Sequence, residues 1–222
     1  MDNSRQDMLV TNACPVTVIG AGSIGSHLAV MLAHAGFNVK LFDPDDLYPE
    51  NIAGGMFDAR MVTRDASKPK AKVASVASLV NMTTGEKLVE PIYGRFPDAD
   101  PEWTGRILLS GVDSMDGRKQ IWEWIKGNAK RTGLELYVDG RIGGHSSTVL
   151  IVNMLDPENI AAYESSLRQP PANLPCGMKS TGYVCSWCAS TMTSAVIHFT
   201  NNGVPMGRVV TLQAQDAFMG YL

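Results

Sequence analysis

Short apolar runs alternate with longer amphipathic stretches along this chain of 222 residues. Continuous runs rich in β-branched residues are typical of buried parallel strands, and apolar residues at helical spacing indicate helices between them. The pattern predicts strands at 16–19, 38–42, 88–93, 107–110, 134–138, 148–152 and 208–212, and helices at 23–35, 69–80, 118–130 and 188–199. This alternation predicts an α/β fold, namely a doubly wound, Rossmann-like, mostly parallel sheet with extra strands toward the C-terminus.

We expect one domain over residues 1–222, because a chain of this length with 45% hydrophobic residues can bury a single large core. The segment from Ala162 to Thr181 contains a Pro-Pro pair and lacks a clear period. It predicts a C-terminal crossover loop over about residues 162–184.

The composition excludes several classes of protein. A net charge of -3 predicts neither a nucleic-acid partner nor an anionic membrane surface as a partner. No apolar run approaches the roughly 18 residues of a membrane span, and the polar residues 1–7 do not resemble a signal peptide. The four cysteines are too few for a disulfide scaffold, so the sequence predicts a cytoplasmic protein.

The first motif is Gly20-Ala-Gly22-Ser23-Ile-Gly25, which follows a predicted strand and begins a predicted helix. Glycines in this context allow a tight turn, close approach of the backbone to a phosphate, and close packing of the helix on the strand. Asp43 ends the next strand, where its carboxylate can accept hydrogen bonds from a ribose. The motif therefore predicts a nucleotide site, with a purely structural glycine turn as the alternative.

Charged residues after the second and fourth strands favour a nucleotide triphosphate over NAD. Lys68, Lys70 and Lys72 can neutralise phosphate charge, unless they simply form a solvated helix face. Asp113 directly follows the fourth strand, where a carboxylate can bind Mg²⁺ together with phosphate oxygens. Asp113 can also cap the following helix, and the two roles are compatible.

Four boxes occur in a fixed order: GAGSIG, Asp43-Pro-Asp45 running to Asn51, Ser-Lys-Pro-Lys-Ala at 67–71, and Asp113-Ser114 with Arg118. In this order they resemble the hallmarks of the ThiF/MoeB/HesA superfamily, the adenylating domain shared with ubiquitin-activating enzymes. The resemblance is strong over roughly residues 14–160 and looser beyond. Four ordered boxes are far more specific than any one of them.

The resemblance implies ATP- and Mg²⁺-dependent adenylation of the C-terminal carboxylate of a ubiquitin-like or sulfur-carrier protein that ends in Gly-Gly. It also implies a homodimer. By the same resemblance, Asp43 would bind the ribose, Asn51 and Lys70 the phosphates, and Asp113 the Mg²⁺. Lys70 and Asp113 are then the predicted catalytic residues.

The sequence departs from the family where an Arg-Gln pair is usual, because Gly54-Gly55 stands there. Arg60, Arg64 or Arg5 are candidates to supply the missing cation. Two alternatives remain open: a non-catalytic scaffold that binds a nucleotide or a carrier, and an NAD-dependent oxidoreductase supported by the glycine motif alone.

The cysteines allow three interpretations. Cys185-Ser-Trp-Cys188 is one C-x-x-C pair, to which Cys176 and His198 would add a third and a fourth ligand of a Zn²⁺ site. Alternatively, Cys176 or Cys185, both expected in the crossover region, accepts the activated carrier as a thioester or persulfide. The third interpretation is that these cysteines simply belong to the core.

Overall fold

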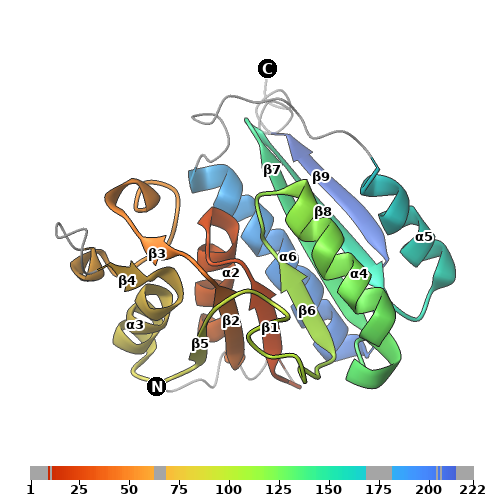
Figure 1. Ribbon diagram of the computed structural model, residues 1–222, viewed down its shortest axis with the longest axis horizontal. Coiled ribbons are helices and arrows are strands. Elements are labelled where there is room, and N and C mark those ends of the chain that lie inside the picture. The colour runs from red at the N-terminus through yellow and green to blue at the C-terminus, as the bar shows by residue number, and fades with distance from the viewer. Residues whose placement is uncertain are drawn as a thin grey trace.

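The computed structural model describes residues 10, 12–62, 69–168, 182–203, 205 and 207–213. A seven-stranded sheet has the order β5-β2-β1-β6-β7-β8-β9 (Figure 1). Its strands are β1 (Val16–Ile19), β2 (Val39–Asp43), β5 (Val89–Tyr93), β6 (Ile107–Ser110), β7 (Leu136–Gly143), β8 (Ser146–Asn153) and β9 (Arg208–Gln213). The strands from β5 to β7 are parallel, whereas β8 and β9 pair antiparallel with their neighbours. The predicted α/β, mostly parallel fold is confirmed.

Helices cover both faces of the sheet (Figure 1). One face carries α2 (Ser23–His34), α3 (Lys72–Thr84) and α6 (Gly182–Asn202), and the other carries α4 (Met115–Thr132) and α5 (Pro157–Ser166). Because both faces are covered, every residue of the central strands β1 and β6 is buried. That burial is the reason why these strands are mostly apolar, without the alternation of a half-exposed strand.

The predicted crossover loop is wrong at both of its ends. Residues 162–166 belong to α5, which Asp156 caps by accepting hydrogen bonds from the N–H groups of Glu158 and Asn159. Pro157 takes the first helical position, where its missing N–H costs nothing. Residues 182–184 belong to α6, which begins at Gly182 and not at the predicted Cys188. The segment between them, 169–181, lies outside the described residues.

Two features of strand pairing were not predicted. Strand β7 begins at Leu136, two residues after the start of the predicted 134–138, and runs on to Gly143, while β8 contains all of the predicted 148–152. Both strands are extended because they form a hairpin that closes at the pair Gly143 and Ser146. A second, two-stranded sheet joins β3 (Asp46–Leu47) to β4 (Lys70–Ala71). Two 3₁₀ turns, Pro49–Asn51 and Ala59–Met61, lie between β3 and β4 in sequence.

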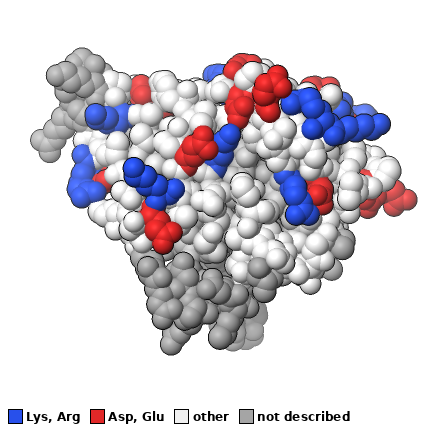
Figure 2. Space-filling model, turned by 90° about the horizontal axis from the view of Figure 1, so that it is seen from below, with Lys and Arg blue, Asp and Glu red and all other residues white. Residues whose placement is uncertain are grey.

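Charges of both signs are mixed on one face of the molecule (Figure 2), as expected for a modest net charge. Figure 2 shows the face seen from below, on which Lys and Arg side chains lie beside Asp and Glu side chains. Among the described residues, no helix is both long enough and apolar enough to cross a membrane.

Candidate functional site

The glycine loop connects β1 to α2 where the strand order changes direction, between β1 and β6. Gly20 has a φ of +92°, which favours glycine, and it packs against Gly111 beyond β6. A Cβ on Gly25 would lie 1.7 Å from the carbonyl oxygen of Gly20, whereas a Cβ on Gly22 would meet nothing within 4 Å. Gly25 is therefore required for packing, and the space beside Gly22 is open to a ligand.

The N-terminus of α2 has the features of an anion site. Gly22 is the N-cap residue, no side chain caps the helix, and the first turn contains no acidic residue. The Nδ1 atom of His27 lies 2.7 Å from the carbonyl oxygen of Ser23. The first N–H groups of a helix carry a partial positive charge, which favours phosphate. The prediction that Gly22 and Ser23 contact phosphates fits this geometry.

The Asp43 carboxylate, at the end of β2, is buried and held by two backbone N–H groups. Its Oδ2 accepts from the N–H of Ala21 at 2.6 Å, and its Oδ1 accepts from the N–H of Asp45 at 2.8 Å. Burial raises the pKa of Asp43, while these N–H groups and the charge of Lys72 act in the opposite direction. Each oxygen keeps a lone pair for a further donor, so the carboxylate can accept from ribose hydroxyls.

The β3–β4 pair brings the lysine box to the same edge of the main sheet. Leu47 pairs with Lys70, so the exposed Lys70 is held just beyond the turn that follows Asp43. Lys72, the first residue of α3, has a side chain only 12% exposed and forms an ion pair with Asp45 at 2.8 Å. Lys72 therefore does not belong to a solvated helix face. Lys68 lies outside the described residues.

Asn51 ends the 3₁₀ turn beyond β3, and its side-chain oxygen accepts from the N–H of Tyr48 at 2.9 Å. The loop then passes through Gly54 and Gly55 to Met56, whose N–H donates to the Ser26 hydroxyl of α2 at 3.0 Å. The loop that follows Asn51 is thereby joined to α2. The amide nitrogen of Asn51 is the group that would reach a phosphate.

Of the three candidates for the missing family arginine, the structure describes Arg60. The guanidinium of Arg60 donates from Nε and Nη2 to the two oxygens of Asp58, each at 2.8 Å. This pair holds the pKa of Asp58 well below its usual range, with the Arg60 hydrogen bond as the largest cause. The guanidinium of Arg60 is thus occupied by the N-cap residue of its own 3₁₀ turn. Arg5 and Arg64 lie outside the described residues.

Asp113 lies exposed beyond the end of β6. The alternative that Asp113 caps the following helix is wrong, because Ser114 is the N-cap of α4. The hydroxyl of Ser114 accepts from the N–H of Gly117 at 3.1 Å. The carboxylate of Asp113 therefore does not cap α4.

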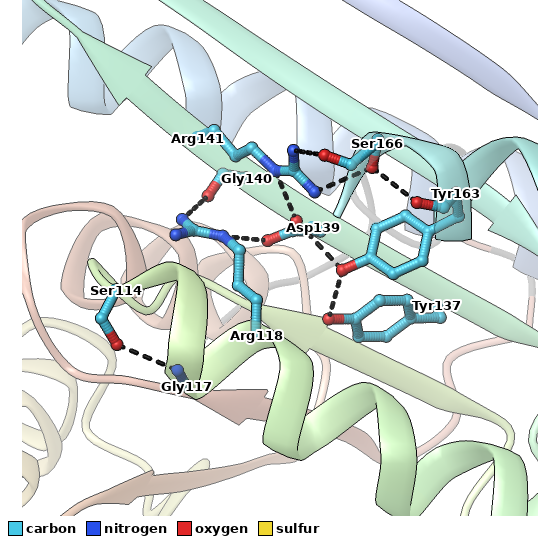
Figure 3. A network of polar contacts seen from close by, with 9 residues as sticks. All are labelled: Ser114, Gly117, Arg118, Tyr137, Asp139, Gly140, Arg141, Tyr163 and Ser166. Carbon is cyan, nitrogen blue, oxygen red and sulfur yellow. Dashed lines mark hydrogen bonds and ion pairs between the residues drawn. The ribbon is translucent and has the colours of Figure 1, made fainter. Parts of the chain in front are cut away.

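Arg118, from the same box, is buried and points away from solvent into a network around Asp139 (Figure 3). It donates from Nε to Asp139 at 3.0 Å and from Nη2 to the carbonyl of Gly140 at 3.1 Å. Arg141 donates to the other oxygen of Asp139 at 2.8 Å, and the Tyr163 hydroxyl donates to it at 3.1 Å. The network anchors α4 to β7 and α5, and so holds the backbone that carries Asp113.

Sequence reasoning missed Asp139, Arg141 and Tyr163. Asp139 aligns with Ser110 across the β6–β7 pair, one strand from the loop of Asp113. A usable signal was the Asp-Gly-Arg sequence directly after an apolar strand, at the edge where charged residues of parallel sheets gather.

Cys185 and Cys188 both lie in α6 and are buried. Cys188 was predicted in a helix, whereas Cys185 was expected in the crossover region. Burial raises the pKa of Cys185, and it raises that of Cys188 to about 12. His198 is ten residues beyond Cys188 on the same helix, about 15 Å along its axis at 1.5 Å per residue, so the two cannot share one ion. Within the part of the chain that the structure describes, no three His, Cys, Asp or Glu residues are grouped to hold a metal. Cys176 lies outside it.

Known proteins match this chain in two comparisons. The model of the ThiF family matches residues 3–217. E. coli MccB, solved with succinimide, superposes with a TM-score of 0.68 at 16% identity, covering 95% of this chain and 63% of MccB. MccB solved with ATP gives a TM-score of 0.62 at 18% identity, covering 94% and 65%. This chain therefore spans less than two thirds of the MccB chain.

A shorter structural relative, TcdA (CsdL), superposes with a TM-score of 0.63 at 15% identity and covers 90% of both chains. At such low sequence identities, these superpositions show a shared fold and nothing more. No curated protein matches the sequence.

Proposed function

This chain belongs to the ThiF family, and from that premise we propose that it adenylates the C-terminal carboxylate of a small protein or peptide with ATP and Mg²⁺. Gly22 and Ser23 would bind phosphate at the start of α2, and Asp43 would bind the ribose. Asn51 and Lys70 would bind phosphates, and Asp113 the metal.

The observation that carries the proposal is the position of Asp113. Asp113 is exposed and follows β6 at the edge of the sheet that also holds the open loop at Gly22 and the carboxylate of Asp43. Helix capping does not account for it, because Ser114 performs that task. Ligands of open α/β sheets bind at this edge, where the strand order changes direction.

Asp113 suits Mg²⁺, which binds proteins through one or two carboxylates and completes its coordination with water and phosphate oxygens. When bound, the ion would neutralise negative charge on the phosphates. No second protein carboxylate is needed for that chemistry.

The proposed step requires no nucleophile or base from the protein. A carboxylate oxygen of the partner attacks the α-phosphorus, the bond from that phosphorus to the bridging oxygen breaks, and pyrophosphate leaves with the electron pair. The product is an acyl adenylate. The N–H groups at Gly22 and Ser23 and the ammonium of Lys70 would orient the phosphates and stabilise the developing charge.

For the partner, we favour a ubiquitin-like or sulfur-carrier protein that ends in Gly-Gly, acting with a homodimer of this chain in the cytoplasm. MccB has been solved with MccA and with N-formylated MccA, which supports a peptide as the second candidate partner. Transfer of the partner to Cys176 stays a proposal. The burial of Cys185 and its raised pKa disfavour it as the acceptor thiol.

Exchange of labelled pyrophosphate into ATP, measured with a candidate carrier ending in Gly-Gly, tests the proposal. Asp113→Asn should lower exchange by about two to three powers of ten, because it removes the charge that holds the metal while keeping the shape. Asp116→Asn is the matched control, since Asp116 is an exposed acid in the first turn of α4. Its exchange should stay near that of the wild type. Undiminished exchange by Asp113→Asn would refute the metal role.

A non-catalytic scaffold is the second candidate function. It is favoured by Gly54-Gly55 and by the commitment of Arg60 to Asp58. A scaffold would bind ATP·Mg²⁺ yet show no pyrophosphate exchange with any carrier. Replacing Gly54 by Arg should then create exchange, since one charge-stabilising donor is worth about two to three powers of ten in rate. Gly55 is kept, because a Cβ there would lie 2.2 Å from the ring of Phe57.

A further inference from the structure

Of the two lysines described at this edge, Lys72 is the more buried, although the motif indicates Lys70. Its side chain is 12% exposed, whereas that of its partner Asp45 is 61% exposed. An ion pair with one well-solvated member adds little to stability. A contribution to stability therefore does not explain why the Lys72 side chain is buried.

A series of polar contacts links Lys72 to the glycine loop. The Nζ of Lys72 contacts the Asp45 carboxylate at 2.8 Å, and the backbone N–H of Lys72 donates to the carbonyl of Asp45 at 3.0 Å. The N–H of Asp45 donates to Asp43 at 2.8 Å, and Asp43 in turn accepts from Ala21 at 2.6 Å. Helix α3 is thus tied twice to the residue that orients the Asp43 carboxylate.

We propose that Lys72 is a positioning residue which, through Asp45, holds the Asp43 carboxylate in the orientation that accepts the ribose hydroxyls of ATP. The inference rests on the proposed nucleotide site and adds a residue to its ribose specificity. Lys72 need not touch the nucleotide. A carboxylate rotated by a few tens of degrees loses its hydrogen bonds to a diol, because such bonds weaken steeply with angle.

The test compares the affinities of ATP·Mg²⁺ and 2′,3′-dideoxy-ATP·Mg²⁺ by titration calorimetry. For the wild type we expect ATP to bind at least about tenfold more tightly, since hydrogen bonds to a charged group are worth that factor or more. Lys72→Met keeps the aliphatic stem and removes the charge. It should reduce the ratio to about twofold by weakening ATP, with little effect on the dideoxy analogue. Lys72→Arg should restore most of the ratio, and Asp45→Asn should lower it as Lys72→Met does.

Lys40→Met is the matched control. Lys40 lies on β2, the strand that ends at Asp43, and forms a comparable ion pair with Asp100 at 2.9 Å, but away from the nucleotide edge. Its loss should leave the ratio unchanged.

Equal weakening of both nucleotides by Lys72→Met would overturn the inference, because a purely structural role or a direct phosphate contact gives that result. A wild-type ratio near one would instead remove the ribose role of Asp43. Failure of the wild type to bind ATP·Mg²⁺ would overturn the proposed function and this inference with it.

Discussion

Gly22 and Gly25 lie three residues apart at the start of α2, yet an added Cβ would have opposite surroundings at the two positions. An added Cβ at Gly25 would overlap the backbone of Gly20 at 1.7 Å from its carbonyl oxygen, whereas at Gly22 it would meet nothing within 4 Å. Alanine should therefore separate their roles. Gly25→Ala should destabilise the fold, and Gly22→Ala should mainly weaken nucleotide binding.

The structure sets the magnitudes. The overlap at Gly25 is with backbone, so no side-chain rotation relieves it, and we expect the upper end of overpacking costs, about 3 kcal/mol. In a domain of this size the Tm should then fall by about 6–12 °C. Gly22 has a φ of -75°, which alanine adopts freely. Only the poorer N-cap character of alanine remains, at about 1 kcal/mol.

Nucleotide affinity should follow the opposite order. A methyl group at Gly22 occupies the open space beside the first N–H groups of α2, where phosphate would bind. Losing one charge-assisted hydrogen bond should raise the Kd for ATP·Mg²⁺ by about tenfold to a hundredfold. Thermal unfolding without ligand and calorimetric titration with ATP·Mg²⁺ measure both effects. Undiminished affinity in Gly22→Ala, or equal Tm losses in the two variants, would refute the reasoning.

Two further predictions concern the ligand and the pH. ATP·Mg²⁺ at about 100 times its Kd should stabilise the protein by roughly 2.7 kcal/mol, whereas NAD⁺ should not stabilise it. A thermal-shift titration measures both effects. Stabilisation by NAD⁺ alone would favour the oxidoreductase alternative. ATP affinity should also fall with acidification as Asp43 takes up a proton, since only the ionised carboxylate accepts from both ribose hydroxyls. Because burial raises the pKa of Asp43, the fall should begin at a higher pH than for an ordinary aspartate. In Asp43→Asn that part of the pH profile should be lost, and an unchanged profile would show that Asp43 does not titrate there.

Local sequence was sufficient to predict an element where all the residues that determine it lie in one segment. The runs at 16–19 and 107–110 are apolar except for Thr17 and Ser110 because both of their faces are covered, so their burial could be predicted from composition alone. The glycine loop could be predicted equally well, since Gly20 needs a positive φ and Gly25 needs the absence of a Cβ. These demands concern residues that are neighbours in the chain.

Local sequence failed where two residues compete for one task. Asp113 and Ser114 are both good helix-capping residues, and nothing in their types decides between them. Only the course of the backbone places the Ser114 hydroxyl on the N–H of Gly117. Likewise, α5 was hidden by its weak period, although Asp156 and Pro157 form a recognisable helix start.

The sequence by itself determined the fold class, the glycine loop and the order of the four boxes, because each depends on residue type and short spacing. The tertiary structure decided which lysine is enclosed and which is exposed, since pairing of β3 with β4 sets the path of Lys70 and Lys72 past Asp45. It also assembled Asp139 with Arg118 and Tyr163 from three separate elements. Such contacts join residues far apart in the chain, and their geometry arises only when helices and sheet pack together.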